Sequence, residues 1–259
     1  EEGVVNLSNL DHYTSISDVS VQLWVKLSSY DCNLFSYRKK FENEKFHLSI
    51  YQDLLTFWTI DENGSNGDVY EWIKSNSSPP LNQWIHIVIQ AGSNGKKMYV
   101  DGVLQNETSA TTFSFNSFEP TNISIGDRDG RPTGGSFSGN IDDFAIWSSY
   151  LSANEISALY NSGSGLNPLS NSGNYNSSSN IKTYLSFDEG EGSNISDQSS
   201  NNANAIAENT SWSDIENPLS TVSSYSTPFS SGSGSSTLTF NYTVQSGHNT
   251  SDLDYASTT

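Results

Sequence analysis

Residues 197–204, DQSSNNAN, combine side chains that bind hard cations with side chains that form tight turns. Calcium takes about six to eight oxygen ligands, usually from a loop that alternates carboxylate, amide and backbone carbonyl groups. Asp197, Ser199, Asn201 and Asn204 offer such groups. The same residue types also form an ordinary Asx-turn, in which the Asp side chain bonds to the nearby backbone. The loop therefore predicts either a calcium ion or a hydrogen-bonded turn.

Two acidic residues in the segment NIDDF, Asp142 and Asp143, are candidates for acid–base chemistry. Glycoside hydrolysis generally requires two carboxyl groups about 5 to 10 Å apart across the scissile bond. Neighbouring residues of a strand point to opposite faces of the sheet, so these two are not expected to act as such a pair. No nucleophile-elbow motif supports a Ser-His-Asp arrangement. The sequence therefore favours a protein that is not an enzyme.

Sugar binding needs aromatic faces and hydrogen-bonding groups, because aromatic rings stack on the C–H patches of pyranose rings. Trp58 and Trp72 lie in segments that read as strands, and they either line an open sheet face or belong to the core. The loop GDRDGRPTGG carries Asp127, Asp129 and Arg131, which can hydrogen-bond sugar hydroxyls. The alternative for this loop is a solvated connection. Together these five residues form the predicted glycan site.

Short segments with alternating apolar residues dominate the chain. VSVQLWVKL, residues 19–27, has the period of two that is expected of a half-buried strand. Further runs of this kind, separated by Gly, Asn, Ser and Pro clusters, are FHLSIY, LLTFWTI, VYEWIK, WIHIVIQ, KMYVDGVLQ, ISIG and NIDDFAIW. This spacing predicts an all-β fold, an antiparallel β-sandwich of the jelly-roll kind.

Two of these segments carry more local information. WIHIVIQ is apolar or aromatic on both faces, which indicates a central strand, and His86 within it is expected to be a neutral histidine bonded to a backbone carbonyl. In KMYVDGVLQ, the Asp101-Gly102 pair is typical of a two-residue hairpin turn.

One short helix is predicted in LSANEISALYNSG, residues 151–163. Ser152 and Glu155 have the spacing of a capping box, and Gly163 is a candidate for the left-handed residue at the end of the helix. A single helix beside a sandwich is expected to cover one edge of it.

Composition limits the partners and the compartment. The 259 residues carry a formal net charge of −18, and such a field repels a phosphate backbone, so nucleic acid is an unexpected partner. No run approaches the ~18 apolar residues that membrane insertion requires, and the segment EEGVVNLSNL has no leader pattern. The single cysteine, Cys32, cannot form an intrachain disulfide and is expected to be buried.

Two ordered segments resemble laminin-G-like domains of the concanavalin A-like lectin/glucanase superfamily. NQWIHIVIQAGSNGKKMYVDGVLQ, residues 82–105, is similar to their W-x-H-V and Y-V-D-G hairpin, and SFSGNIDDFAIWSSYLSANEISALYNSG, residues 136–163, is similar to their I-D-D strand and closing helix. The resemblance covers residues 15–165 and implies a lectin-like jelly roll. The E-x-D-x-x-E pattern of the superfamily's glucanases is absent.

The segment TYLSFDEGEGSNISDQSSNNANA, residues 183–205, resembles the opening strand and loop of these domains, although it follows their closing helix. We therefore expect a circular permutation in which residues 181–214 complete a jelly roll that spans residues 1–214. The resemblance of the loop to D-x-S-G-N-x-N implies a structural calcium, with Asp197 and Asn201 as ligands and Asp143 as the partner from the other end of the domain.

Residues 215–259 are expected to be a linker and a fragment of another repeat. Their segment SSTLTFNYTVQSGHNTSDLDYASTT resembles the immunoglobulin- or cadherin-like repeats of large bacterial surface adhesins. The resemblances imply an extracellular module, secreted or on the cell surface, that binds a glycan or another cell-surface ligand, with neighbouring domains or subunits of a longer surface protein as further partners. The alternatives are a structural spacer or filament subunit and, less favoured, a glycoside hydrolase.

Overall fold

The computed structural model describes residues 3–13, 16–30, 32–38, 46–61, 69–109, 122–126, 137–213, 229–231 and 239–240. Contact analysis divides the chain into two units, Glu1–Leu219 and Ser220–Thr259. In the second unit, β15 (Phe229–Ser231) pairs antiparallel with β16 (Thr239–Phe240). The rest of the segment that resembles an adhesin repeat lies outside the described residues.

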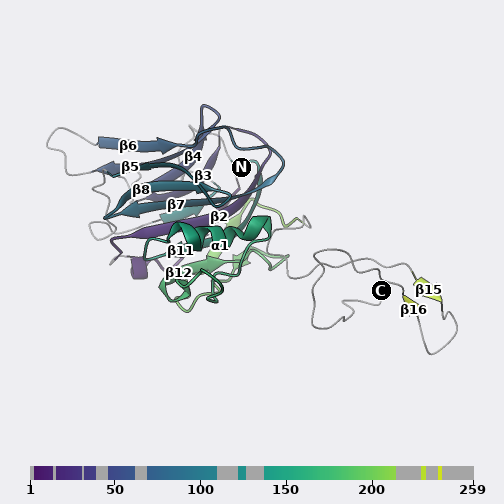
Figure 1. The fold of residues 1–259 in the computed structure, drawn as a ribbon. Helices are drawn as coiled ribbons and strands as arrows, with labels where there is room; N and C mark the ends of the chain where they lie inside the picture. Colours follow the sequence, from purple (N-terminus) through teal and green to yellow (C-terminus); the bar gives the residue numbers. More distant parts are fainter. Residues whose placement is uncertain are drawn as a thin grey trace. The chain divides into compact units, whose positions relative to one another are not determined.

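The first unit is an antiparallel β-sandwich (Figure 1). Among the described residues, the larger sheet has eight strands, in the spatial order β13 (Asn194–Ile195), β14 (Ala205–Glu208), β1 (Val4–Leu7), β10 (Asn122–Ile125), β3 (Asn33–Arg38), β4 (Phe46–Tyr51), β5 (Leu54–Asp61) and β6 (Val69–Lys74). The smaller sheet has six, in the order β12 (Ile181–Leu185), β11 (Gly139–Trp147), β2 (Val19–Leu27), β7 (Trp84–Gly92), β8 (Gly95–Val100) and β9 (Val103–Thr108).

The main core lies between the two sheets. In the larger sheet the register aligns one row of buried apolar residues across adjacent strands: Val5, Ile125, Phe35, Leu48, Phe57 and Ile73. The smaller sheet contributes the alternate residues of β2 and β7, such as Leu23 and Ile87. Because side chains of a strand alternate between faces, the neighbouring row of the larger sheet faces outward.

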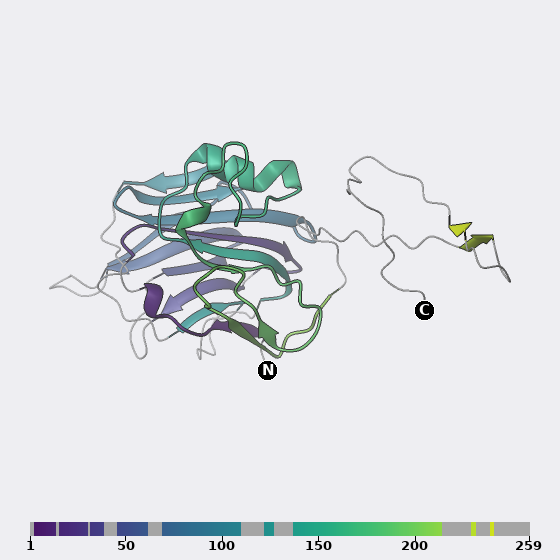
Figure 2. The same ribbon diagram turned by 90° about the horizontal axis from the view of Figure 1, so that it is seen from below.

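The outer face of the smaller sheet is also covered. The described part of the chain has one α-helix, α1 (Ala153–Tyr160), and this helix and the segment after it lie over that face (Figures 1 and 2). They enclose a second buried cluster that includes Trp147, Leu159 and Tyr175. The indole of Trp147 donates to the hydroxyl of Tyr175 at 2.9 Å. The expectation of a half-buried strand at residues 19–27 is therefore wrong, because β2 is buried on both faces.

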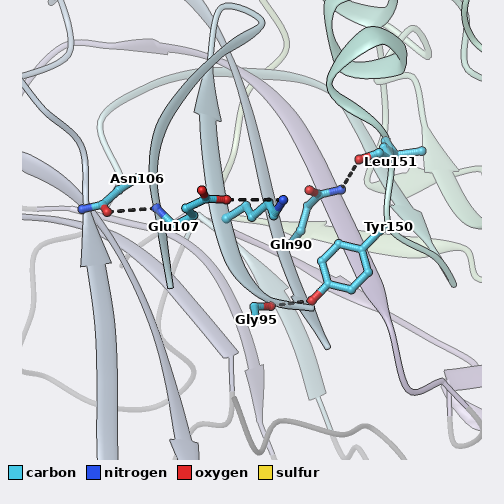
Figure 3. Close-up of polar contacts among 7 residues, drawn as sticks. Gln90, Gly95, Asn106, Glu107, Tyr150 and Leu151 are labelled. Carbon is cyan, nitrogen blue, oxygen red and sulfur yellow. Dashed lines mark hydrogen bonds and ion pairs between the residues drawn. The ribbon is translucent and has the colours of Figure 1, made fainter. Parts of the chain in front are cut away.

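Polar contacts join this cover to the sheet (Figure 3). Gln90 on β7 donates to the carbonyl of Leu151 at 3.0 Å, and the hydroxyl of Tyr150 donates to the carbonyl of Gly95. At the far edge of the same sheet, Lys97 and Glu107 form an ion pair at 3.3 Å between β8 and β9. The cover is thus attached through specific hydrogen bonds as well as through apolar packing.

The ends of α1 agree in part with the sequence. Ser152 and Glu155 form the predicted capping box. The left-handed residue at the end of the helix is Asn161, with φ 46°, rather than the predicted Gly163. Asparagine tolerates this conformation because its short side chain bonds locally, and here its Nδ2 donates to the carbonyl of Gly165 at 2.8 Å. Short 3₁₀ turns within the described ranges are η1 (Asp11–Tyr13), η3 (Asn161–Gly163) and η4 (Ser178–Asn180).

Strands from the late part of the first unit join both sheets. β12 pairs antiparallel with β11, and β14 pairs antiparallel with both β1 and β13. The hydroxyls of Tyr13 and Thr183 are hydrogen-bonded between sequence-distant segments. Residues 181–208 thus supply edge strands to the two layers. Strand β1, to which no sequence pattern pointed, is held between β14 and β10.

Candidate functional site: an aromatic platform on the larger sheet

Trp58 and Trp72 lie side by side on the outer face of the larger sheet. They are opposite one another in the register of β5 and β6. Trp72 is 61% exposed, although tryptophan side chains are highly buried on average. Tyr51, at the end of β4, is 51% exposed. An exposed tryptophan beside a partly exposed one provides aromatic faces to which a ligand can bind.

Lys74 places a positive charge among these rings. Its Nζ lies 4.9 Å from the centre of the Tyr51 ring and 5.9 Å from that of Trp72, distances at which a cation is attracted to a ring face. The same atom donates to Oε1 of Gln52 at 3.1 Å. We call Tyr51, Trp58, Trp72 and Lys74 the aromatic platform.

A row of polar residues continues from the platform across the outer face. The register aligns Trp58 with His47, Ser36, Ser124 and Asn6 on successive strands. The hydroxyl of Ser124 donates to Oδ1 of Asn6 at 2.9 Å, and the His47 ring meets Trp58 edge-on at 4.7 Å between centroids. His47, Ser36 and Ser124 are nevertheless buried, with 2%, 1% and 1% exposed, so the accessible part of this row is its aromatic end.

Of the five predicted sugar-site residues, the structure brings Trp58 and Trp72 together on neighbouring strands. Asp127, Asp129 and Arg131 lie outside the described residues. Two members of the platform, Tyr51 and Lys74, were not predicted. Lys74 could have been found, because it is two residues from Trp72 in the same strand and such residues share a face. Tyr51 carries no such signal, because it depends on the pairing of β4 with β5.

Asp142 and Asp143 do not alternate between the faces of the sheet as expected of neighbouring residues in a regular strand. The register of β11 with β2 shifts between Asp142 and Ala145, and Asp143 has φ 47°. This bulge buries both carboxyl groups, with 4% of Asp142 and 1% of Asp143 exposed. Burial raises the pKa of both groups, and the charge of Asp143 raises the pKa of Asp142 further. The hydroxyl of Tyr184 donates to Oδ1 of Asp143 at 2.6 Å.

The Asp197 loop forms the hydrogen-bonded turn that was one of its two predicted states. Oδ1 of Asp197 accepts from the backbone N–H of Tyr184 and of Ser199, and Oδ2 accepts from the Ser199 hydroxyl and the Ala203 N–H, all at 2.7 to 2.9 Å. Asn201 donates to the carbonyls of Ile181 and Lys182. The chain itself therefore supplies partners to both carboxylate oxygens of Asp197.

Asp143 and Asp197 contact opposite ends of the same tyrosine, because Asp143 accepts from the hydroxyl of Tyr184 and Asp197 from its backbone N–H. Within the described ranges, no group of three or more His, Cys, Asp or Glu side chains is arranged to share a metal ion. In this arrangement the loop accommodates calcium only if hydrogen bonds of Asp197 are exchanged for metal contacts. Calcium binding by Asp143, Asp197 and Asn201 stays a prediction.

His86 is buried without the backbone hydrogen bond that was expected of its ring. Neither ring nitrogen has a partner, and the ring packs against Trp24 and Tyr160 at 4.9 and 6.1 Å between centroids. Burial lowers the pKa of His86 to about 3, so the imidazole stays neutral at physiological pH. The turn that follows has the predicted form, since Asp101 and Gly102 both have positive φ.

Comparison with models of known families shows to which superfamily this sandwich belongs. The family model described as concanavalin A-like lectin/glucanases superfamily, Laminin_G_3, matches residues 1–157. The chain belongs to this superfamily. The match includes the strands of the aromatic platform and ends before β12, β13 and β14. None of the curated proteins is significantly similar in sequence to this concanavalin A-like chain.

Several solved structures are similar to this chain at low sequence identity. A candidate carbohydrate binding protein from Bacteroides ovatus ATCC 8483 is 16% identical, with a TM-score of 0.56 over 80% of this chain and 58% of that one. Domain 4 of AbnA, an extracellular arabinanase from Geobacillus stearothermophilus solved with arabinotriose, is 20% identical, with a TM-score of 0.44 over 56% and 66%. Botulinum neurotoxin type C, whose cell entry depends on two ganglioside molecules, is 16% identical, with a TM-score of 0.44 over 61% and 42%.

Proposed function

We propose that this chain is a non-catalytic glycan-binding module and that the aromatic platform is its binding surface. The observation that carries the proposal is Trp72, which is 61% exposed and paired in register with Trp58. The faces of such rings stack on the apolar C–H patches of a sugar. Lys74 adds a donor between Tyr51 and Trp72.

The solved structures are consistent with a binding module but establish the fold alone. The Bacteroides ovatus protein is a candidate carbohydrate binding protein, and this chain covers 58% of it. Glycan binding by this chain therefore rests on its own platform residues.

The non-catalytic part of the proposal rests on burial. A glycosidase needs two carboxyl groups that face the scissile bond from either side. Asp142 and Asp143 are the neighbouring pair that came nearest to this requirement in sequence, and at 4% and 1% exposure neither can reach a polymeric substrate from outside. The sequence also lacks the E-x-D-x-x-E pattern.

We place this module in a bacterial surface adhesin, outside the cell. The acidic composition and the resemblance of the last segment to adhesin repeats support this setting. No helix in the described part of the chain has the length and apolar character needed to cross a membrane. The entry of β12 and β14 into the two sheets supports the circular permutation, because those strands follow the closing helix in the chain.

A glycan array probed with the whole chain tests the proposal. We expect binding by the wild type, in buffers with calcium or with chelator, and an affinity about tenfold or more lower for Trp72→Ala, because burying a large apolar side chain contributes about 1.5 to 3 kcal/mol. Val103→Ala is the matched control, because Val103 is 62% exposed and belongs to the smaller sheet. If the wild type binds no glycan on the array, a structural spacer is favoured. If Trp72→Ala binds as well as the wild type, the glycan site does not include Trp72.

A further inference from the structure

A cavity of about 340 Å³ opens between the two sheets, away from the platform. Its walls come from β1, β10, β13 and β14 of the larger sheet, from Trp84 on β7 and the first half of β11 in the smaller sheet, and from residues 209–213. β11 pairs with β12 only from Phe144 to Trp147, so the residues of β11 before Phe144 have no partner in β12. The cavity therefore lies where the edge of one sheet separates from the other. Its volume is in the lower part of the range of about 300–1,000 Å³ that is usual for small-molecule sites.

The lining combines aromatic rings with hydroxyl groups. Phe137, Phe187 and Trp212 contribute rings, and Thr210 and Ser211 contribute hydroxyls. The N–H of the Trp212 indole donates to the carbonyl of Gly192 at 2.8 Å, which fixes this ring in place before any ligand arrives. Preformed sites of this mixed kind bind ligands that have both apolar faces and hydrogen-bonding groups.

Asp142 gives the cavity a polar group that lacks a partner. It lines the cavity and is 4% exposed, and its Oδ2 has no hydrogen-bond partner in the fold. A buried carboxyl oxygen without a partner is unfavourable, so a ligand hydroxyl that reaches the Asp142 carboxyl group is bound favourably.

The charge of the lining excludes one class of ligand. Among the described residues that line the cavity, none is Lys, Arg or His. An anionic group would therefore enter without a counter-ion, which is unfavourable. A ligand that fits must therefore have hydroxyl groups and an apolar face but no negative charge.

We infer that this cavity binds a single neutral sugar residue, with a sugar hydroxyl bonded to Asp142 and a sugar face against the ring of Trp212. This is a second site, separate from the aromatic platform. In the larger sheet β1 and β5 are four strand spacings apart, or about 19 Å at the usual distance of about 4.8 Å per spacing. A glycan chain that contacts both sites would have to cross the sheet edge.

Calorimetric titration of the whole chain with methyl glycosides tests this inference. The probes are the methyl glycosides of glucose, galactose, mannose, xylose and arabinose, and the methyl glycosides of glucuronic and galacturonic acid as matched anionic partners. We expect at least one neutral probe to bind, and its uronic acid partner, where the set contains one, to bind at least tenfold more weakly. Saturation-transfer NMR then identifies which protons of the bound sugar face the protein.

Variants separate this site from the platform and from effects on folding. Ser211→Trp fills the mouth of the cavity at an exposed residue and should lower the affinity for the neutral probe at least tenfold. Ser170→Trp, at an exposed serine outside the lining, should bind like the wild type. Trp72→Ala should also bind the probe like the wild type, so loss of platform binding and loss of cavity binding give different patterns. Failure of every neutral probe, equal binding of a uronic acid partner, or full binding by Ser211→Trp would overturn the inference.

Discussion

The outer faces of the two sheets differ in how far their aromatic side chains are exposed. On the smaller sheet, α1 and the segment after it cover the face and bury Trp147 and Tyr175 completely. On the larger sheet, Trp72 is 61% exposed and Tyr51 51% exposed. Both faces carry tryptophan, so the residue type alone does not distinguish structure from function. The difference shows that the covering segment, rather than the residue type, determines whether an aromatic residue stabilises the core or is accessible to a ligand.

The largest expected effect comes from removing the late strands. Truncation after residue 180 deletes β12, β13 and β14 and leaves the edges of β11 and β1 unpaired. We expect an aggregated or unfolded product, because an unpaired edge and an opened core favour association. Truncation after residue 219, which keeps the first unit whole, is the control and should leave the Tm of that unit unchanged. A soluble 1–180 fragment with the Tm of the longer one would show that the covered face is stable without these strands.

The next effect distinguishes the covered face directly. Trp147→Ala removes a fully buried ring and the hydrogen bond of its indole to Tyr175, which should cost about 3–5 kcal/mol, or roughly 10 °C in Tm. Thermal unfolding followed by circular dichroism measures it. Trp147→Phe keeps most of the packing and should lose less. A Trp147→Ala protein with the wild-type Tm would mean that the second cluster does not stabilise the fold.

The Asp197 loop gives an intermediate effect with a metal-dependent part. Asp197→Ala leaves the N–H groups of Tyr184, Ser199 and Ala203 without their acceptor and should lower the Tm by several degrees even in chelator. If calcium binds as the sequence predicts, it also raises the wild-type Tm by mass action, and this rise disappears in the variant. Equal wild-type Tm values with calcium and with chelator would exclude the ion and leave the hydrogen-bonded turn alone.

The smallest effect is on the exposed face. Trp72→Ala should change the Tm by no more than about 2 °C, because exposed substitutions usually change stability by less than about 0.5 kcal/mol. Its effect should be confined to ligand binding, in contrast to Trp147→Ala. A loss of stability as large as that of Trp147→Ala would assign Trp72 to the fold and remove the basis of the proposed platform.

Most of the longer strands could be predicted because each has its own local signal, whereas β1 and β3 were not predicted. FHLSIY is β4 and WIHIVIQ begins β7, a central strand between β2 and β8 as predicted. The burial of both faces of β2 could not be predicted, because the segment that covers it lies more than a hundred residues further along the chain. The alternation of apolar residues within a strand identifies the face that packs in the core, but a segment from elsewhere in the chain can bury the opposite face.

The candidate site was predictable only in part for the same reason. Trp58 and Trp72 were found from residue type, whereas their alignment depends on the register of β5 with β6. The bulge at Asp143 made the prediction of opposite faces for Asp142 and Asp143 wrong. It could not be predicted, because a non-glycine residue with positive φ does not change the pattern of apolar and polar residues in the sequence. The cavity beside Asp142 arises from segments at both ends of the first unit and has no local motif.

The pairing of β1 with β14 has a mechanical consequence. Val4 lies opposite Glu208 and Leu7 opposite Ala205, so the chain enters and leaves the sandwich at the same corner. Tension applied through these two ends loads the Val4–Glu208 end of the ladder first and opens the hydrogen bonds in succession, like a zipper. A shearing geometry would load them all at once. Stretching of single molecules should therefore show β14 peeling away at low force while the rest of the sandwich stays folded.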